Sequence, residues 1–293
     1  MYHILYAFLY LLSLLPLRLL YLISDLLFFL SFSLLSYRKD VVMANLRIAF
    51  PDRPETERKK IAKRFYRNLT DTLAETIKFI TWDRAEFDRH FSCDLSGLHV
   101  ALKEKKTVYL IGMHNFNWEF ANWGLVNKMP LPFLGIYMPL ANKHLNKIIL
   151  DMRSRFGTIM IPAVTFRESY ATYRNIPHVL ATVADQSPGD PSQAYWLHFF
   201  KHPTGFIKGT EKGARANNAS VVFAHFYKKK RGHYHLDTKF ITNDIHAWKE
   251  GELTIQYAQY IESCLQQHPD NYLWSHRRWK HAWKESYGPL INS

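Results

Sequence analysis

The chain has 293 residues, enough for two small domains or one larger α/β domain. Lys and Arg (38) outnumber Asp and Glu (25), which gives a formal charge of +13, while residues 1–37 hold 28 apolar residues and only two charges, Arg18 and Asp25. The remaining body has an ordinary apolar fraction, which excludes a protein with many membrane spans and a disordered chain. Cys93 and Cys264 stand far apart, which argues against a disulfide scaffold and a cysteine-based zinc site.

The apolar head, residues 1–37, differs from a secretory signal peptide, because no Lys or Arg precedes the apolar run and no small-residue cleavage site follows it. Three arrangements are open: a tilted spanning helix, an in-plane or re-entrant hairpin kinked at Pro16, and a buried helix of a soluble core. The density of Leu, Phe and Tyr disfavours the third. Basic residues follow the head directly and favour the cytoplasmic side for the body. We expect a membrane anchor at 1–37 and one domain at 38–293.

The body begins with helical patterns and then changes its periodicity. Residues 45–51 predict a short helix before a proline turn, and residues 55–80 predict an amphipathic helix with an apolar stripe from Ile61 through Leu73 to Ile77. Strands are expected at 107–112, 133–137, 179–184 and 221–226, with an edge or antiparallel strand at 233–241. Helices are expected at 142–156, 209–217 and 252–267. The alternation predicts an α/β domain with a mixed, largely parallel central sheet flanked by helices.

The sharpest candidate for chemistry is the segment 112–119, where a buried strand ends and a helix begins. His114 and Glu119 are five residues apart and would not share a face of a regular helix. They can meet if His114 lies on the turn before the helix and Glu119 on its first turns. A carboxylate bonded to one ring nitrogen would then make the other a general base. Because a chain with 15 histidines produces this spacing by chance, a satisfied histidine in a turn is the competing interpretation.

The residues around this segment carry a resemblance that covers nearly the whole chain. The chain resembles the late acyltransferases of lipid A biosynthesis, the lauroyl/myristoyl transferase branch of the lysophospholipid acyltransferase superfamily. The segments that carry it are the apolar head, Asn45-Leu46 with Ala49-Phe50-Pro51, His114 with Glu119 as an H-x4-D/E motif, residues 137–157, Asp185-Gln186, Gly209 with Ala214, and the specific ending at 272–280. Met138, where many members have Arg or Lys, and the lack of a second acidic residue after Asp185 are departures that bear on the acceptor.

The resemblance implies transfer of an acyl chain from a thioester of acyl carrier protein, or of coenzyme A, to a hydroxyl of an anionic lipid, a lipid A precursor. The expected place is the cytoplasmic side of the bacterial inner membrane, and no metal, cofactor or acyl-enzyme is expected. His114 would be the base, Glu119 would hold its imidazole, Arg153 would stabilise the oxyanion, and Asp185 would orient Arg153 or contact the acceptor. Further substrate contacts are expected at Asn117, Tyr137, Asn142, Arg155, Gln186, Gly209, Trp274, His276, Arg277 and Arg278.

Other interpretations stay open at this point. The basic and aromatic ending suggests an interfacial belt or anion site, or a structural C-terminal segment. The run 228–231 (KKKR) suggests a solvated hairpin tip, or a surface for acyl carrier protein. The same chemistry could act on a glycerophospholipid, an aminolipid or a glycolipid. A nucleic-acid-binding protein is disfavoured because no basic recognition helix or aromatic RNA-binding strand is found, and an inactive membrane-anchored scaffold is disfavoured by the combined presence of His114, Glu119, Arg153 and Asp185.

Overall fold

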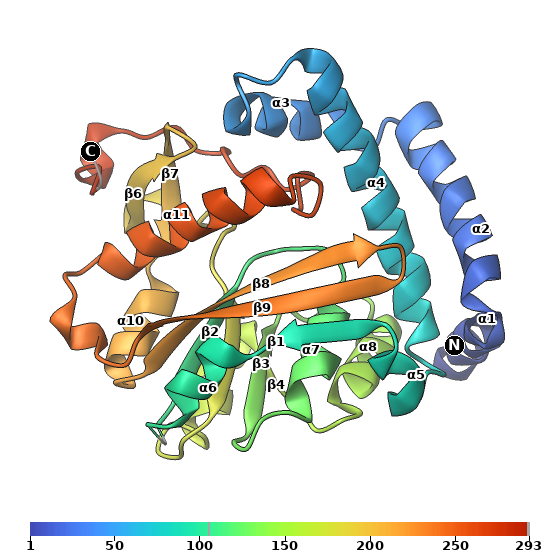
Figure 1. Ribbon diagram of the computed structural model, residues 1–293, viewed down its shortest axis with the longest axis horizontal. Helices are drawn as coiled ribbons and strands as arrows, with labels where there is room; N and C mark the ends of the chain where they lie inside the picture. The colour runs from blue at the N-terminus through green and yellow to red at the C-terminus, as the bar shows by residue number, and fades with distance from the viewer. Residues whose placement is uncertain (105, 292–293) are drawn as a thin grey trace.

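A seven-stranded sheet forms the centre of the protein in the computed structural model, which describes residues 1–104 and 106–291 (Figure 1). The strand order is β1-β9-β8-β2-β5-β3-β4, and every neighbouring pair is parallel except β8 with β9. The strands are β1 (Phe91–Asp94), β2 (Val108–Gly112), β3 (Phe133–Tyr137), β4 (Ile159–Pro162), β5 (Val179–Val183), β8 (Ser220–Lys230) and β9 (His233–Thr242). The expected mixed, largely parallel sheet is confirmed.

Two details of the sheet differ from the expectation. An edge or antiparallel strand was expected at 233–241, and β9 is indeed antiparallel to β8. It is not an edge strand, because β1 pairs in parallel with its other side. The short strands β1 and β4 were not expected, since four residues are too few to reveal an alternating pattern. A separate antiparallel hairpin, β6 (Ala194–Phe199) with β7 (His202–Ile207), was also missed.

Helices surround this sheet. They are α1 (Tyr2–Leu14), α2 (Leu17–Phe29), α3 (Lys39–Ala49), α4 (Glu55–Lys78), α5 (Arg84–Asp88), α6 (Ser96–Leu102), α7 (Trp118–Val126), α8 (Lys143–Ser154), α9 (Phe166–Ala171), α10 (Gly209–Ala216) and α11 (Glu252–Gln267). Shorter helical turns are η1 (Leu30–Leu34), η2 (Ala163–Thr165), η3 (Pro191–Gln193), η4 (Ile245–Ala247) and η5 (Glu285–Tyr287). The helix expected at 252–267 is confirmed at both ends, and those expected at 55–80, 142–156 and 209–217 are confirmed with slightly shorter bounds.

Alternate side chains of each strand separate the interior into two cores, because successive residues of a strand point to opposite faces. Val108 and Leu110 of β2 belong to the core that α6 and α7 cover. Tyr109 and Ile111 of the same strand belong to the core that α3, α4 and α11 cover. Figure 1 shows α11 across one face of the sheet and α7 with α8 on the other. The carboxyl ends of β2, β5 and β3 therefore lie between two helical layers.

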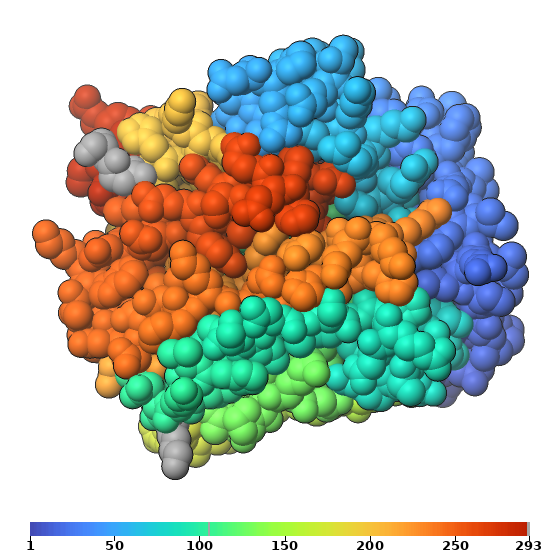
Figure 2. Space-filling view, in the orientation of Figure 1, coloured from blue at the N-terminus to red at the C-terminus, as the bar shows by residue number. Residues whose placement is uncertain are grey.

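The head lies along one side of the body (Figures 1 and 2), where α2 runs beside α4 and α1 lies at the lower end of these two helices. The chain breaks between the two helices at Pro16, as the kink in the hairpin alternative requires. Lys78 donates to the carbonyls of Ser13 (2.8 Å) and Leu15 (2.9 Å), so a cation of the body satisfies the carboxyl end of α1. The continuous helix Leu17–Leu34 is long and apolar enough to cross a membrane, by length and composition.

Candidate active site

His114 and Asp185 form the central pair of the site. Each lies two residues beyond a strand, His114 after β2 and Asp185 after β5, and these two strands are parallel neighbours with Gly112 opposite Val183. The two turns therefore meet at the same edge of the sheet. The Nδ1 atom of His114 is 2.8 Å from Oδ1 of Asp185, and the backbone N–H of His114 donates to Oδ2 at 3.0 Å. The expectation that Glu119 holds the imidazole is wrong, because this strand pairing gives that place to Asp185.

The pair is electrostatically coupled. The side chain of Asp185 is 1% exposed and that of His114 is 21% exposed. Burial opposes ionisation of Asp185, but the charge of His114 and its two hydrogen bonds outweigh burial and lower the pKa of Asp185 to about 2. Burial disfavours the imidazolium, but the Asp185 carboxylate outweighs it and raises the pKa of His114 above its ordinary value. An imidazole held in this way has increased basicity at Nε2.

Glu119 instead pairs with Arg153. Nε of Arg153 lies 3.0 Å from both carboxylate oxygens, and Nη2 lies 2.6 Å from Oε1. The indole N–H of Trp118 also donates to Glu119, at 3.0 Å. The expectation that Asp185 orients Arg153 is therefore wrong, and the two carboxylates have exchanged the partners that we assigned to them. The bidentate contact fixes the plane of the guanidinium beside the histidine turn.

Asn117 shapes the turn that separates His114 from Glu119. It has φ 57° and ψ 48°, the left-handed conformation, and it directly precedes α7. That conformation costs roughly 1–2 kcal/mol for an ordinary residue and less for Asn, whose side chain can bond locally. The side chain is fully buried and donates to Oε2 of Glu75 at 2.6 Å. Asn117 is therefore a buried support of the turn, and the expected substrate contact is wrong.

A cavity of about 440 Å³ opens at the carboxyl ends of β2, β3 and β5. Its polar lining includes His114, Glu119, Arg153 and Gln186, and Tyr137 lines it at the end of β3, so these expected residues lie together. The exposed side chains of Met138 and Leu140 mark its rim. Its apolar lining from the sheet and from α7 and α8 includes Leu110, Ala121, Leu125, Phe133, Gly135, Ile149, Leu150, Ala181, Ala224, Phe226 and Leu236. The volume is within the ~300–1,000 Å³ range of small-molecule sites.

The C-terminal segment 272–276 forms hydrogen bonds with both turns of the site. The N–H of Leu273 donates to the carbonyl of His114 at 3.0 Å, and the hydroxyl of Tyr272 donates to the carbonyl of Asp185 at 3.3 Å. Nε2 of His276 accepts from the N–H of Ser187 at 2.9 Å. The pKa of His276 is lowered to about 4, mainly by burial and then by the charges of Arg278 and His114. His276 is therefore a neutral structural acceptor beside the site.

The start of the body, in α3 and the turn before it, contacts this C-terminal segment. The side chain of Asn45 in α3 donates at 2.7 Å to the carbonyls of Trp274 and His276. Arg38 also donates to the carbonyl of Ser275, at 3.1 Å. Two segments that carry the family resemblance at opposite ends of the chain thus form one contact.

The aromatic and basic ending is only partly buried: Trp279 is half-buried, and Arg277 and Lys280 are exposed. Trp274 is fully buried and donates to the carbonyl of Pro269. Arg278 is buried, donates to the carbonyl of Gly205 at 2.9 Å, and lies over the ring of Phe206. Their burial favours the structural alternative for these two residues. Arg277 is exposed and keeps its place as a candidate for an anionic acceptor.

Three other expected contacts lie outside the cavity lining. Arg155 donates to the carbonyls of Phe79, Ile80 and Trp82, so its guanidinium is bound to the end of α4. Asn142 caps α8, because its side-chain oxygen accepts from the N–H groups of His144 and Leu145 at 3.0 Å. Gly209 begins α10, which packs on the opposite face of the sheet through Ala214. None of the three lines the cavity, and substrate contact at these positions stays a prediction.

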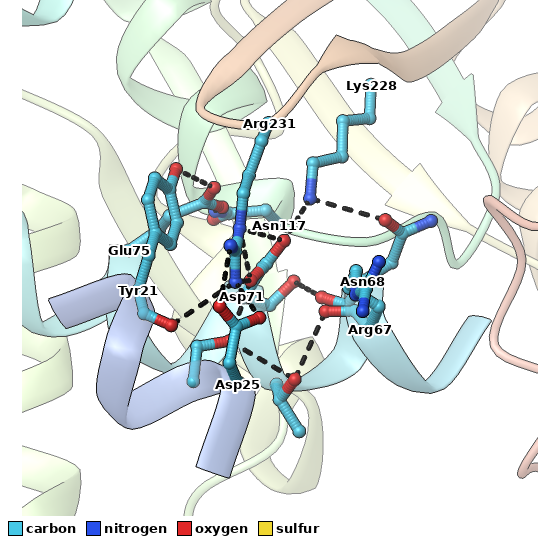
Figure 3. A network of polar contacts seen from close by, with 12 residues as sticks. Tyr21, Asp25, Arg67, Asn68, Asp71, Glu75, Asn117, Lys228 and Arg231 are labelled. Carbon is cyan, nitrogen blue, oxygen red and sulfur yellow. Dashed lines mark hydrogen bonds and ion pairs between the residues drawn. The ribbon is translucent and has the colours of Figure 1, made fainter. Parts of the chain in front are cut away.

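A buried carboxylate cluster on α4 was missed by sequence reasoning. Asp71 and Glu75 are fully buried, whereas Leu73 of the expected apolar stripe is 54% exposed. Lys228 and Arg231 at the β8–β9 turn bond Asp71 at 2.7 and 2.6 Å, so these two residues of the KKKR run are not a solvated tip (Figure 3). Lys229 and Lys230 are exposed as expected. One sequence pattern could have indicated this cluster: Asp71 and Glu75 are four residues apart on one face of α4, in the half of the helix that has few basic residues.

A half-buried base beside an apolar cavity is the arrangement that an enzyme acting on a lipid or an acyl chain needs. The family model for bacterial lipid A biosynthesis acyltransferases matches residues 1–281, so the chain belongs to this family. It is 23% identical over 252 residues to a lipid A biosynthesis acyltransferase of Haemophilus influenzae, covering 83% of this chain and 78% of the relative. It is also 23% identical over 258 residues to a lipid A biosynthesis lauroyltransferase of Escherichia coli, covering 83% and 79%. The expected family and its enzyme class, acyltransferase, are confirmed.

Within the ranges that the structure describes, 1–104 and 106–291, no group of three or more His, Cys, Asp and Glu side chains is placed to hold a metal ion.

Proposed function

We propose that the protein transfers a fatty acyl chain from an acyl thioester, carried by acyl carrier protein, to a hydroxyl of a lipid A precursor at the cytoplasmic side of the inner membrane. The observation that carries the proposal is the His114–Asp185 pair at the opening of the apolar cavity. The cavity matches a hydrocarbon chain, and the histidine stands where the reacting end of that chain would emerge. Family membership supports acyl transfer as the reaction.

His114 acts as the general base in this proposal. Its Nδ1–H is held by Asp185, so Nε2 takes the proton of the acceptor hydroxyl as the oxygen attacks the thioester carbonyl. A C–O bond forms, and collapse of the tetrahedral intermediate breaks the C–S bond. The imidazolium then gives its proton to the departing thiolate. Asp185 stabilises the imidazolium by its charge, so the carboxylate that we expected at position 119 is supplied from the neighbouring strand.

Arg153 is the charged group nearest to this chemistry on α8. Glu119 occupies Nε and Nη2 of the guanidinium, so Nη1 is the nitrogen left to face the thioester oxygen or an anionic group of the acceptor. Glu119 then acts by fixing Arg153. Removal of Glu119 would release the guanidinium and leave the His114–Asp185 pair intact.

The floor of the cavity predicts how acyl chains are selected. Ala181 of β5 lies opposite Leu110 of β2 and Gly135 of β3, and all three line the cavity. Replacing Ala181 with Phe would fill this space. We expect kcat/KM for long-chain donors to fall about tenfold or more, since one methylene in an apolar pocket changes discrimination by roughly 10- to 200-fold. Short-chain donors are the internal control and should keep their rates. An equal loss for donors of all lengths would contradict placement of the chain in this cavity.

The head is proposed to lie in the membrane surface, the in-plane alternative. Helix α2 presents Tyr21, Ser24 and Asp25 to the body, where they bond Glu75, Asp71 and Arg231. A spanning α2 would carry this charged cluster into the hydrocarbon, at roughly 2.5–3.5 kcal/mol for each charge. The opposite side of the head exposes large apolar side chains, including Ile4, Phe8, Leu11, Leu22, Leu26 and Phe29. An amphipathic arrangement of this kind suits one leaflet.

The two membrane arrangements differ in where the turn between α1 and α2 lies. Leu14 is exposed next to this turn. If α2 spanned the membrane and the body were cytoplasmic, a cysteine at position 14 would reach the periplasm. We expect a Leu14→Cys variant to resist a membrane-impermeant maleimide in intact cells and to react after lysis. Labelling of intact cells would contradict the in-plane arrangement.

Mass spectrometry of lipids from a strain that lacks the gene tests the function itself. Loss of one acyl chain from lipid A, restored by the wild-type protein and not by His114→Ala, is the expected result. Unchanged lipid A with an altered phospholipid, aminolipid or glycolipid would assign the same chemistry to that acceptor and reject lipid A. Rates with matched acyl carrier protein and coenzyme A thioesters then test the proposed donor.

A further inference from the structure

We propose that Glu75 is a positioning residue for the catalytic turn, and that Tyr21 of the head completes its support. This inference rests on the proposed function, because it concerns the turn that carries His114 and Glu119. Glu75 lies on α4 and does not line the cavity, so it can influence acyl transfer only through other residues.

Three segments that are distant in sequence converge on the Glu75 carboxylate (Figure 3). Oε2 accepts from the side-chain amide of Asn117 and from the hydroxyl of Tyr234, both at 2.6 Å. Oε1 accepts from the hydroxyl of Tyr21 at 2.7 Å. Glu75, Asn117 and Tyr234 are buried. A buried carboxylate with three donors is satisfied only while all three stay in place, so loss of any one partner disturbs the others.

The contact with Asn117 connects this cluster to the site. Asn117 holds the left-handed turn that separates His114 from α7, and Glu119 lies in the first turn of that helix. Without an acceptor for its amide, Asn117 loses the contact that favours this conformation, and the turn can relax to ordinary backbone angles. His114 and Glu119, with its partner Arg153, would then shift relative to one another. Misplacement of a catalytic group by about 1 Å can cost ~10²-fold in rate.

The contact with Tyr21 brings the head into the same support. Tyr21 comes from α2, and its ring also lies 4.2 Å from the Arg231 guanidinium at the β8–β9 turn. Ser24, one turn further along α2, donates to Asp71 at 2.6 Å, and within residues 1–104 and 106–291 it makes no hydrogen bond to Glu75 or Asn117. Two hydroxyls of α2 thus bind two different carboxylates. Removing each hydroxyl in turn separates the effect of the Glu75 contact from the effect of weaker binding between the head and the body.

The experiment measures kcat, KM and thermal unfolding of full-length variants with acyl carrier protein thioester and lipid A precursor in mixed micelles. Glu75→Met removes the acceptor at similar volume, and we expect kcat to fall about tenfold or more with KM for both substrates nearly unchanged. Adding Asn117→Gly should restore most of kcat, because glycine adopts a positive φ without side-chain support. A merely structural loss would not be rescued by a glycine, which makes the chain more flexible.

Tyr21→Phe and Ser24→Ala keep the test decisive if Glu75→Met folds poorly. We expect Tyr21→Phe to lower kcat several-fold and Ser24→Ala to leave it unchanged, although each removes one hydroxyl from α2. Equal kcat in Tyr21→Phe and wild type, equal losses in the two variants, or no rescue of a folded Glu75→Met by Asn117→Gly would each overturn the inference. Absence of acyl transfer by the wild type would reject the proposed function instead, so the two failures are distinguishable.

Discussion

Asp185→Asn is expected to lower kcat about 10²- to 10⁴-fold, close to the loss in His114→Ala, because one variant loses the charge that stabilises the protonated base and the other loses the base itself. Asparagine keeps the shape of Asp185 but not the charge that stabilises the imidazolium. The double variant should be little worse than either single one, since residues that act as a unit are not additive. Steady-state rates of purified, folded protein give the measurement. Near wild-type kcat in Asp185→Asn would reject the proposed pair.

The pH dependence gives an independent check of the same pair. The base must be neutral, so kcat/KM of the wild type should fall as pH drops through the pKa of His114, which Asp185 raises above the ordinary value. Without the carboxylate, burial alone acts on the imidazole and favours its neutral form. The acidic limb of Asp185→Asn should therefore move to lower pH. Glu119→Gln is the matched carboxylate control, and it should leave the position of that limb unchanged because Glu119 contacts Arg153.

Asp71→Asn is expected to destabilise the protein by about 3 kcal/mol or more, since removal of one partner from a buried ion pair leaves the other charge uncompensated. The Asp71 side chain is 1% exposed and holds both Lys228 and Arg231. Burial opposes its ionisation, but the bonds from Arg231 and Lys228 outweigh burial and lower its pKa. Its stabilisation is therefore complete above the unfolded pKa, ordinarily about 3.9, and is lost as pH falls through the lower folded pKa.

Asp25→Asn is the matched control, because Asp25 binds the same Arg231 but its side chain is 43% exposed. An exposed pair contributes only about 0–1 kcal/mol. Urea unfolding of the detergent-solubilised protein should show a clear loss for Asp71→Asn and a small one for Asp25→Asn. Equal losses in the free energy of unfolding would contradict the prediction, because they would show that the buried Asp71 contributes no more than the exposed Asp25.

The fold was largely predictable because its strands and helices have strong periodic patterns. The apolar runs at β2, β3, β5 and β8 and the stripe of α11 fix elements by local chemistry alone. The four-residue strands β1 and β4 carry too little pattern and form only because a neighbouring strand offers its unpaired edge. Their existence depends on the assembled sheet.

The residues of the site were easier to find than their partners. His114, Glu119, Arg153 and Asp185 do come together, but the order β2-β5 in the sheet, which pairs His114 with Asp185, is not visible in a spacing of five residues. Motif residues also support the site without lining it, as Tyr272 and His276 do, and residue type alone does not separate these roles. Buried carboxylates such as Glu75 look like exposed ones until their three donors are assembled around them.

The C-terminal segment has a consequence for the order in which the enzyme is made. Chains emerge from the ribosome starting at the N-terminus. The apolar head is therefore available to the lipid surface long before Tyr272, Leu273 and His276 are synthesised, and these residues complete the bonds behind the His114 and Asp185 turns. A nascent or truncated chain that ends before Tyr272 therefore lacks the last support of both turns. Residues 272–276 are therefore a late-formed support, and the two turns are completed only after this segment has been synthesised.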